Sequence, residues 1–381
     1  MPLELTTFAS KLSRYREQFA LSVEQLADAT GISRDVILEL EGATRAPTGD
    51  HVLIFADYFK CDYKFFVSNE QLAPIDQTEK LFRRWGSDLS PGDRWAIQEF
   101  LFLCENEAFL ADALDLPRPS SFSFTKRGTH YKTHGSAAAA ELRRFVGHGP
   151  KEIPVDVFAD FRAVGVHVFR RQLANTKISG MFLKHPTAGK CVLVNYSEDV
   201  YRQRFTAAHE AGHAVLDDTE DFVVSFANWA KDDLVEIRAN TFAAHYLMPP
   251  EYVTRMPTIE WTSESVVDVA HRMRVNVDVL LIALVRDRRM DGSTASTFKG
   301  LKVPREMKSD PEVSASLSSA GRAQKIALLQ RGLSTHYVRM CFEAYERGIV
   351  SAGRVAEMLL ATEAELREIG ALYGWTAKHG A

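Results

Sequence analysis

The first 73 residues carry apolar positions at the spacing of helix faces, broken by two turn signals. Ser22 precedes a helical stretch in which Gln25, three residues on, completes a capping box. Gly31 suits the end of this helix, and Ser33 suits the cap of the next one. Two helices joined by a short turn with glycine predict a helix-turn-helix, followed by a loop and two short helices.

The pattern changes over residues 74–117, where a helical spacer in two pieces is predicted. The second piece begins at Ser90, a suitable cap before a proline, and is strongly apolar from Trp95 to Leu114. It must therefore pack against other parts of the protein. Proline, serine and glycine then mark residues 118–135 as a linker.

Residues 136–290 differ from the preceding segments because short apolar runs, typical of strands, occur between predicted helices. Helices are expected at 136–145 and 156–163, and strands at 165–169, 180–183 and 191–195. We expect these strands to form a small antiparallel sheet. Two longer helices follow, at 204–216 and at 234–248, and the second is stopped by two prolines.

The remainder is again helical. Two short helices at 265–273 and 277–286 have a second helix-turn-helix shape, with a basic face interpreted as solvated. Residues 291–319 are predicted to be a loop or linker, and residues 320–381 a helical tail. Helices in this tail are expected at 323–331, 334–347 and 351–360. The fold class predicted is α+β, mostly helical, with one small sheet.

The clearest chemistry lies on the helix at 204–216, which contains His209-Glu210-x-x-His213. Residues i and i+4 share a helix face, so both imidazoles can bind one metal ion. A carboxylate beside them that activates water is typical of zinc hydrolases. Two surface histidines on an amphipathic helix are the alternative.

A third ligand is expected from the helix at 234–248, where Glu236 and Asn240 share a face. Glu236 can complete a His₂Glu set, and Asn240 is placed to accept a hydrogen bond from a ligating imidazole. Zinc is the expected metal, with manganese as the alternative. The rival ligands are His245, Asp217, Asp218, Asp232 and Asp233.

Other groups are candidates near this site. An oxyanion formed during hydrolysis needs a hydrogen-bond donor besides the metal. The candidates are Tyr196, Tyr201, His245 and His271. Cys191 is either a buried small residue or a thiolate that caps the metal in a latent form.

Composition argues against a protein attracted to nucleic acid or membranes by its net charge, and against one held together by disulfides. The 381 residues suffice for several domains, and a net charge of −4 predicts no general attraction to nucleic acid or anionic membranes. The four cysteines are far apart, which argues against a disulfide framework and fits a reducing cytoplasm. No signal peptide and no membrane-spanning run of about 18 apolar residues is recognised.

The N-terminal module resembles the XRE (Cro/phage-repressor-like) helix-turn-helix family through Leu26-Ala27, Gly31-Ile32-Ser33, Leu40-Glu41 and Pro47. The resemblance implies DNA binding through residues 22–45. The implied contacts are Ser33, Arg34, Asp35 and Arg45. Seven basic and eleven acidic residues in 1–73 give a charge of −4, which opposes phosphate binding. Docking of a protein or dimerisation is the alternative.

Residues 136–287 resemble the ImmA/IrrE family of metallopeptidases. The resemblance rests on Arg204-Phe205-Thr206-x-Ala208-His209-Glu210-x-Gly212-His213 and on Glu236-x-x-Ala239-Asn240-x-Phe242-Ala243-Ala244-x-x-Leu247-Met248-Pro249. It implies His209, His213 and Glu236 as ligands and Glu210 as the base. It also implies a gluzincin-like peptidase whose substrate is a bacterial regulatory protein, often an XRE-type repressor. His245 departs from the family pattern, which has an acid there.

Three functions follow as expectations. The leading one is a cytoplasmic zinc-dependent peptidase that cleaves a regulatory protein and carries an XRE-like module. The second is a DNA-binding regulator or antitoxin-like protein whose peptidase-like domain senses a signal. A scaffold without metal is the third, and a homodimer is left open in each case.

Overall fold

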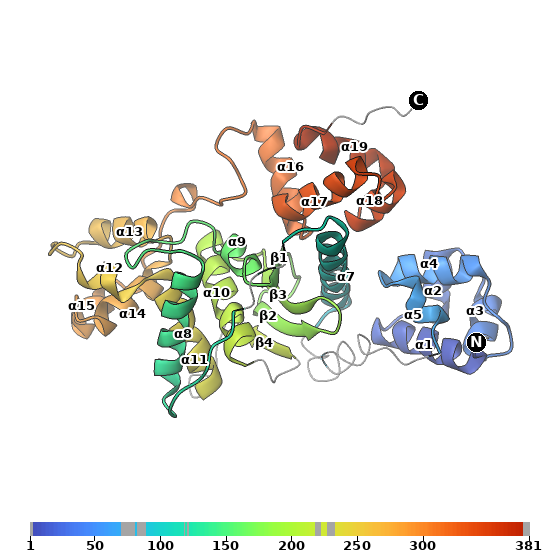
Figure 1. Cartoon of the computed structure of the whole chain (residues 1–381), viewed down its shortest axis with the longest axis horizontal. Coiled ribbons are helices and arrows are strands. Elements are labelled where there is room, and N and C mark those ends of the chain that lie inside the picture. The colour runs from blue at the N-terminus through green and yellow to red at the C-terminus, as the bar shows by residue number, and fades with distance from the viewer. Residues whose placement is uncertain are drawn as a thin grey trace. The chain divides into compact units, whose positions relative to one another are not determined.

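The computed structural model describes residues 3–69, 81, 89–117, 119, 122–217, 222–226 and 233–375 (Figure 1). The chain divides into two compact units, an N-terminal unit of residues 1–103 and a C-terminal unit of residues 104–381. No helix among the described residues is both long enough and apolar enough to cross a membrane.

The N-terminal unit contains the predicted helix-turn-helix. Its helices are α1 (Leu5–Gln18), α2 (Val23–Thr30), α3 (Arg34–Glu41), α4 (Gly49–Phe59) and α5 (Tyr63–Val67). Ser22 and Gln25 form the expected capping box, and the Ser33 side chain accepts a hydrogen bond from the backbone N–H of Val36. Leu26 and Ile37 are fully buried in the core between the helices. The sequence prediction for this module is confirmed.

Helix α7 (Pro91–Ala113) begins where the sequence predicts. The Ser90 hydroxyl accepts a hydrogen bond from the Asp93 backbone N–H at 3.1 Å, and the Asp93 carboxylate accepts from Ser90 in return. Within the N-terminal unit, Trp95 stacks on Phe19 with ring centroids 4.1 Å apart. The first predicted piece of the spacer lies largely outside the described residues.

Among its described residues, the C-terminal unit contains one sheet of four strands in the order β1-β3-β2-β4. The strands are β1 (Val166–Arg171), β2 (Ile178–His185), β3 (Gly189–Asn195) and β4 (Phe222–Phe226). The sheet is mixed rather than wholly antiparallel, since β1 runs parallel to β3. Strand β4 was not predicted. Alternation of apolar residues reports a strand but not the direction of its neighbour, so the expectation of a wholly antiparallel sheet was wrong on this point.

Both faces of this sheet are buried, which explains the apolar runs Met181-Phe182-Leu183 in β2 and Cys191-Val192-Leu193-Val194 in β3. Val168, Phe182 and Val192 belong to the core that includes the helix α10 (Val200–Leu216). The neighbouring positions point the other way because side chains alternate along a strand. There Phe169 packs edge-on against Tyr337, with ring centroids 5.6 Å apart.

Three helices frame the predicted site. Helix α10 lies against the sheet, and α8 (Tyr131–Phe145) and α11 (Leu234–Leu247) run side by side (Figure 1). Helix α8 begins five residues before the predicted helix, inside the expected linker. Gly135 permits its close approach to α11, because a Cβ atom there would lie 2.4 Å from the Arg238 carbonyl oxygen.

Helix α10 is also held from its N-terminal side by a buried arginine. The Arg204 guanidinium donates to the carbonyl oxygens of Pro154 at 2.6 Å and Val155 at 2.7 Å. It also donates to the carbonyl oxygen of Arg274 at 3.3 Å. Burial lowers the pKa of Arg204 to about 10, which still leaves it charged at neutral pH. These bonds fix α10 to the loop before α9 (Val157–Arg162) and to the turn between α13 (Ser263–Arg272) and α14 (Val277–Arg286).

The other elements of this unit are helices. They are α12 (Pro250–Thr254), α13 (Ser263–Arg272), α14 (Val277–Arg286), α15 (Gly292–Thr297), the 3₁₀ helix η1 (Arg305–Met307), α16 (Ser319–Gln330), α17 (Thr335–Glu346), α18 (Ala352–Met358) and α19 (Glu363–Leu372). The second helix-turn-helix shape is present as α13 and α14. The expected linker at 291–319 contains α15, which Asp291 caps. Helix α19, capped by Thr362, lies in the predicted helical tail, but its bounds were not predicted.

Candidate metal centre

The predicted metal helix is buried on every side. Each residue of α10 from Gln203 to Leu216 is buried, so the helix lies inside the unit and not on its surface. His209 and His213 are fully buried on one face, with their Nε2 atoms 3.0 Å apart. The alternative of two surface histidines is therefore excluded.

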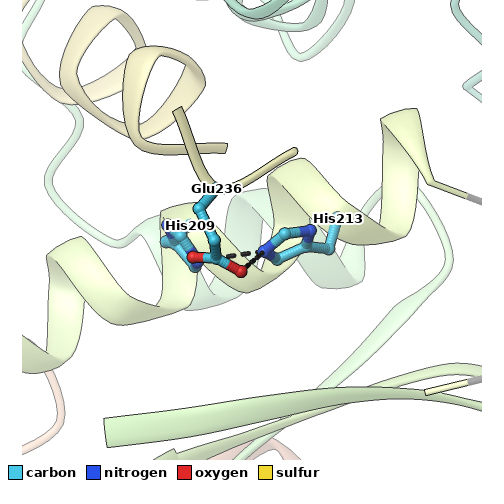
Figure 2. Close-up of side chains that lie close together, drawn as sticks. All are labelled: His209, His213 and Glu236. Carbon is cyan, nitrogen blue, oxygen red and sulfur yellow. Dashed lines mark hydrogen bonds and ion pairs between the residues drawn. The ribbon is translucent and has the colours of Figure 1, made fainter. Parts of the chain in front are cut away.

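Glu236 completes a cluster with these two imidazoles. It lies in the first turn of α11, and its Oε2 atom is 3.3 Å from His209 Nε2 while its Oε1 atom is 3.4 Å from His213 Nε2. Figure 2 shows the carboxylate lying against both rings. Burial alone would raise the pKa of Glu236, but the two imidazoles lower it well below its usual range.

This cluster fits a divalent metal ion. The three ligand atoms all lie within 4.8 Å of one another, and two imidazoles with one carboxylate are a common donor set for catalytic zinc. Burial lowers the pKa of His209 to about 3, although Glu236 opposes this shift. Its imidazole is therefore neutral at neutral pH, and neutral imidazole is the form that binds metals.

Glu210 is the next residue on α10 and is also fully buried. Among the described residues, neither of its carboxylate oxygens has a hydrogen-bond partner of ordinary geometry. Burial raises the pKa of Glu210 to about 8, and the Ser225 hydroxyl on β4 acts in the opposite direction. A buried carboxyl group without a fixed partner, next to two potential ligands, suits transfer of a proton to and from a reactant.

Asp217, which the sequence indicated as a rival ligand, lies behind the cluster. Asp217, at the end of α10, is buried, and its Oδ2 atom is 2.9 Å from His213 Nδ1. Its other oxygen forms an ion pair with Arg238 of α11. Asp217 therefore contacts the ring nitrogen opposite the one that faces Glu236. The spacing of four residues between His213 and Asp217 was the signal in the sequence.

Asn240 was expected to hold an imidazole in place. It lies half-buried on α11, one turn after Glu236. The partner that the structure gives to His213 Nδ1 is the Asp217 carboxylate, not this amide. The role of Asn240 remains a prediction.

The predicted oxyanion donors make their contacts elsewhere. The Tyr201 hydroxyl lies 2.9 Å from Nδ1 of His271, and Tyr201 is two turns before His209 on α10. The Tyr196 ring lies under the Arg170 guanidinium, 5.5 Å from its centroid. Burial lowers the pKa of His245 to about 4, with Arg286 contributing. A role of these four side chains as oxyanion donors stays a prediction.

Cys191 also lies away from the cluster. It is fully buried on β3, between Lys190 and Val192, and Val192 faces α10. Since neighbouring side chains alternate, Cys191 points to the opposite face of the sheet. There it is close enough to Cys104 to raise the pKa of that thiol, after the larger effect of burial. Asp218 and Asp232 lie outside the described residues, and Asp233 caps α11.

The predicted DNA contacts lie on the N-terminal unit. Ser33 caps α3, and Asp35 next to it is exposed. Arg34 forms an exposed ion pair with Glu24 at 2.7 Å, and Arg45 forms one with Glu39 at 3.0 Å. Both arginines thus have acidic neighbours. Exposed pairs of this kind are weak and can rearrange when a partner binds.

Comparison with known proteins agrees with this geometry. Residues 161–285 match the sequence model described as the IrrE N-terminal-like domain, a peptidase family, and residues 12–66 match a helix-turn-helix model. A relative is the radiation response metalloprotease IrrE of Deinococcus radiodurans, 28% identical over 182 residues. The match covers 46% of this chain and 53% of that protein, so the chain spans about half the length of this relative. The chain therefore carries a helix-turn-helix domain followed by an IrrE N-terminal-like domain.

Proposed function

We propose that the protein is a metal-dependent endopeptidase that cleaves a regulatory protein, such as a transcriptional repressor. The observation that carries this proposal is the convergence of His209, His213 and Glu236 beside the buried Glu210. Zinc is the proposed metal, because two imidazoles and a carboxylate suit it, and manganese is the alternative. Location in the cytoplasm stays a prediction.

The residues of the chain divide the work of peptide hydrolysis. His209, His213 and Glu236 would hold the metal, which when bound supplies Lewis acidity toward a peptide carbonyl group and toward water. Glu210 accepts a proton from the attacking water and passes it to the amine that leaves. Its burial raises its pKa, so a proton that it accepts is held more strongly than on an exposed glutamate and can be carried to the amine.

The test compares the wild-type protein with Glu210→Gln. Each purified protein is loaded with zinc and incubated with a cell lysate of the source organism, and newly formed N-termini are identified by mass spectrometry. We expect new N-termini with the wild type only, with equal zinc content in both proteins. Glu264→Gln, on the exposed first turn of α13, is the matched control and should cleave normally. Identical N-termini with Glu210→Gln would refute the proposed mechanism.

A second function is favoured by the helix-turn-helix match over residues 12–66. This domain would bind DNA through α3, with Ser33, Arg34, Asp35 and Arg45 as proposed contacts. Selection of binding sites from random duplex DNA tests it. We expect an enriched sequence whose binding weakens with salt and with Arg34→Ala. No enrichment would favour a role of the domain in docking a protein.

A further inference from the structure

Asp217 stands behind one of the proposed metal ligands. Its Oδ2 atom lies 2.9 Å from Nδ1 of His213, while Nε2 of the same ring faces Glu236 at 3.4 Å. The carboxylate is thus on the far side of the ring from the proposed metal. Asp217 is buried, so water competes little for this contact.

This contact selects one form of the imidazole. A carboxylate can only accept a hydrogen bond, so Nδ1 must carry the proton. The lone pair of His213 is then on Nε2, where a metal ligand needs it. The same bond fixes the rotation of the ring. Asp217 thereby makes His213 ready to bind before a metal arrives.

Arg238 extends this arrangement to the second helix of the site. It forms an ion pair with the other oxygen of Asp217 and lies on α11, two residues after Glu236. Its guanidinium also lies over the Tyr131 ring of α8, 5.1 Å from the centroid. The pair therefore joins the end of α10, which carries two ligands, to the start of α11, which carries the third.

We infer that Asp217 and Arg238 are positioning residues that set the metal affinity of the His209–His213–Glu236 site. The inference rests on the proposed function, since it needs that site to bind metal. Asp217 orients His213, and Arg238 holds Asp217 and the α10–α11 spacing. Neither residue ligates the metal. Partners of this kind typically contribute 10–100-fold to metal affinity.

The test measures zinc affinity of the full chain by competition with a chromophoric chelator, and the visible spectrum of the Co²⁺-loaded protein. Asp217→Asn keeps the size of the side chain but permits the wrong tautomer of His213. We expect zinc affinity to fall about 10–100-fold and the Co²⁺ bands to shift. Asp160→Asn is the matched control, because Asp160 pairs with His148 at 2.8 Å away from the ligands. It should retain wild-type affinity and spectrum.

A second variant keeps the inference testable if Asp217→Asn does not fold, which thermal melting will reveal. Arg238→Gln leaves the bond between Asp217 and His213 but removes its anchor, and should weaken zinc binding several-fold. Wild-type affinity in a folded Asp217→Asn protein, or in Arg238→Gln when the former is unfolded, overturns the inference. An equal loss of zinc affinity in Asp160→Asn also overturns the inference, since the loss would then reflect general destabilisation of the fold. A wild-type protein that binds no zinc would instead refute the proposed function.

Discussion

At the residue scale, the space for Glu210 depends on a missing side chain. Gly180 on β2 faces α10, and a Cβ atom there would lie 2.6 Å from Thr206 Cγ2 and 2.9 Å from the Leu193 carbonyl oxygen. The same atom would lie 3.1 Å from Oε1 of Glu210. The first two distances are too short for any real contact, so α10 or β2 would have to move. Glycine at this position thus allows the metal helix to rest directly on the sheet.

Gly180→Ala is therefore predicted to lower both stability and activity. Overpacking of a buried site costs about 1–3 kcal/mol in the free energy of unfolding, and the shift of α10 should displace Glu210. Urea unfolding and peptidase assays on zinc-loaded protein measure the two effects. Gly292→Ala is the control, because nothing lies within 4 Å of its Cβ position. If Gly180→Ala has wild-type stability, this account of the close approach is wrong.

The sequence predicted the residues that share one helix better than it predicted contacts between elements. His209 and His213 follow from helical spacing alone, and Glu236 follows from a second helix with its apolar pattern. Spacing also suggested Asn240 as the partner of a ligating imidazole, and that role stays a prediction. The Asp217 carboxylate lies one turn after His213 at the end of the same helix, but spacing alone does not distinguish a ligand of the metal from a partner of the imidazole.

At the scale of elements, α7 is tied to the sheet and to α17 by a buried carboxylate. Glu107 lies 2.8 Å from Nδ1 of His167 on β1 and 3.3 Å from Nε2 of His336 on α17. Burial disfavours the charged forms of both Glu107 and His167, but the attraction between these two charges outweighs the effect of burial. The pKa of His167 is raised to about 9 and that of Glu107 is lowered to about 2.

These shifts predict how stability depends on pH. The raised pKa of His167 contributes stability that is fully present below pH 6.5 and is lost as the pH rises through about 9. The lowered pKa of Glu107 contributes stability above pH 4.5 that is lost as the pH falls through about 2. Between pH 6.5 and 9.5 the wild type should lose about 1–3 kcal/mol more than the double variant Glu107→Gln/His167→Gln. Urea unfolding at both pH values measures this difference, and equal losses would contradict it.

Elements were predicted well where they are long and capped, and poorly where tertiary contacts decide them. The caps at Ser22, Ser33 and Ser90 were read correctly because local hydrogen bonds form them. Strand β4 was missed, although its five residues, FVVSF, are mostly of the aromatic and β-branched types that favour strands. The parallel pairing of β1 with β3 was missed because the sequence pattern of a strand does not specify the direction of its neighbour.

At the scale of the whole molecule, metal binding should stabilise only one of the two units. The ligands all belong to the C-terminal unit, and a ligand stabilises the state that binds it. Zinc at 100–1,000 times its dissociation constant should add about 2.7–4.1 kcal/mol to the free energy of unfolding of this unit. Scanning calorimetry with zinc and with a chelator tests this. Glu236→Ala should abolish the increment and the exposed Glu251→Ala should keep it, whereas an increment retained by Glu236→Ala would exclude this ligand set.

The covering of the sheet on both faces limits which part of this chain could fold if it were moved into another gene. The family match spans residues 161–285, yet α8 before it packs on α11, and the Gln330 carbonyl oxygen after it accepts a hydrogen bond from the Gln172 backbone N–H. Tyr337 covers Phe169 on the back of the sheet. A gene fragment cut at the limits of the match would encode a sheet with one bare apolar face, which favours aggregation. We therefore expect recombination that yields a folded protein to carry α8 and the C-terminal helices together with residues 161–285.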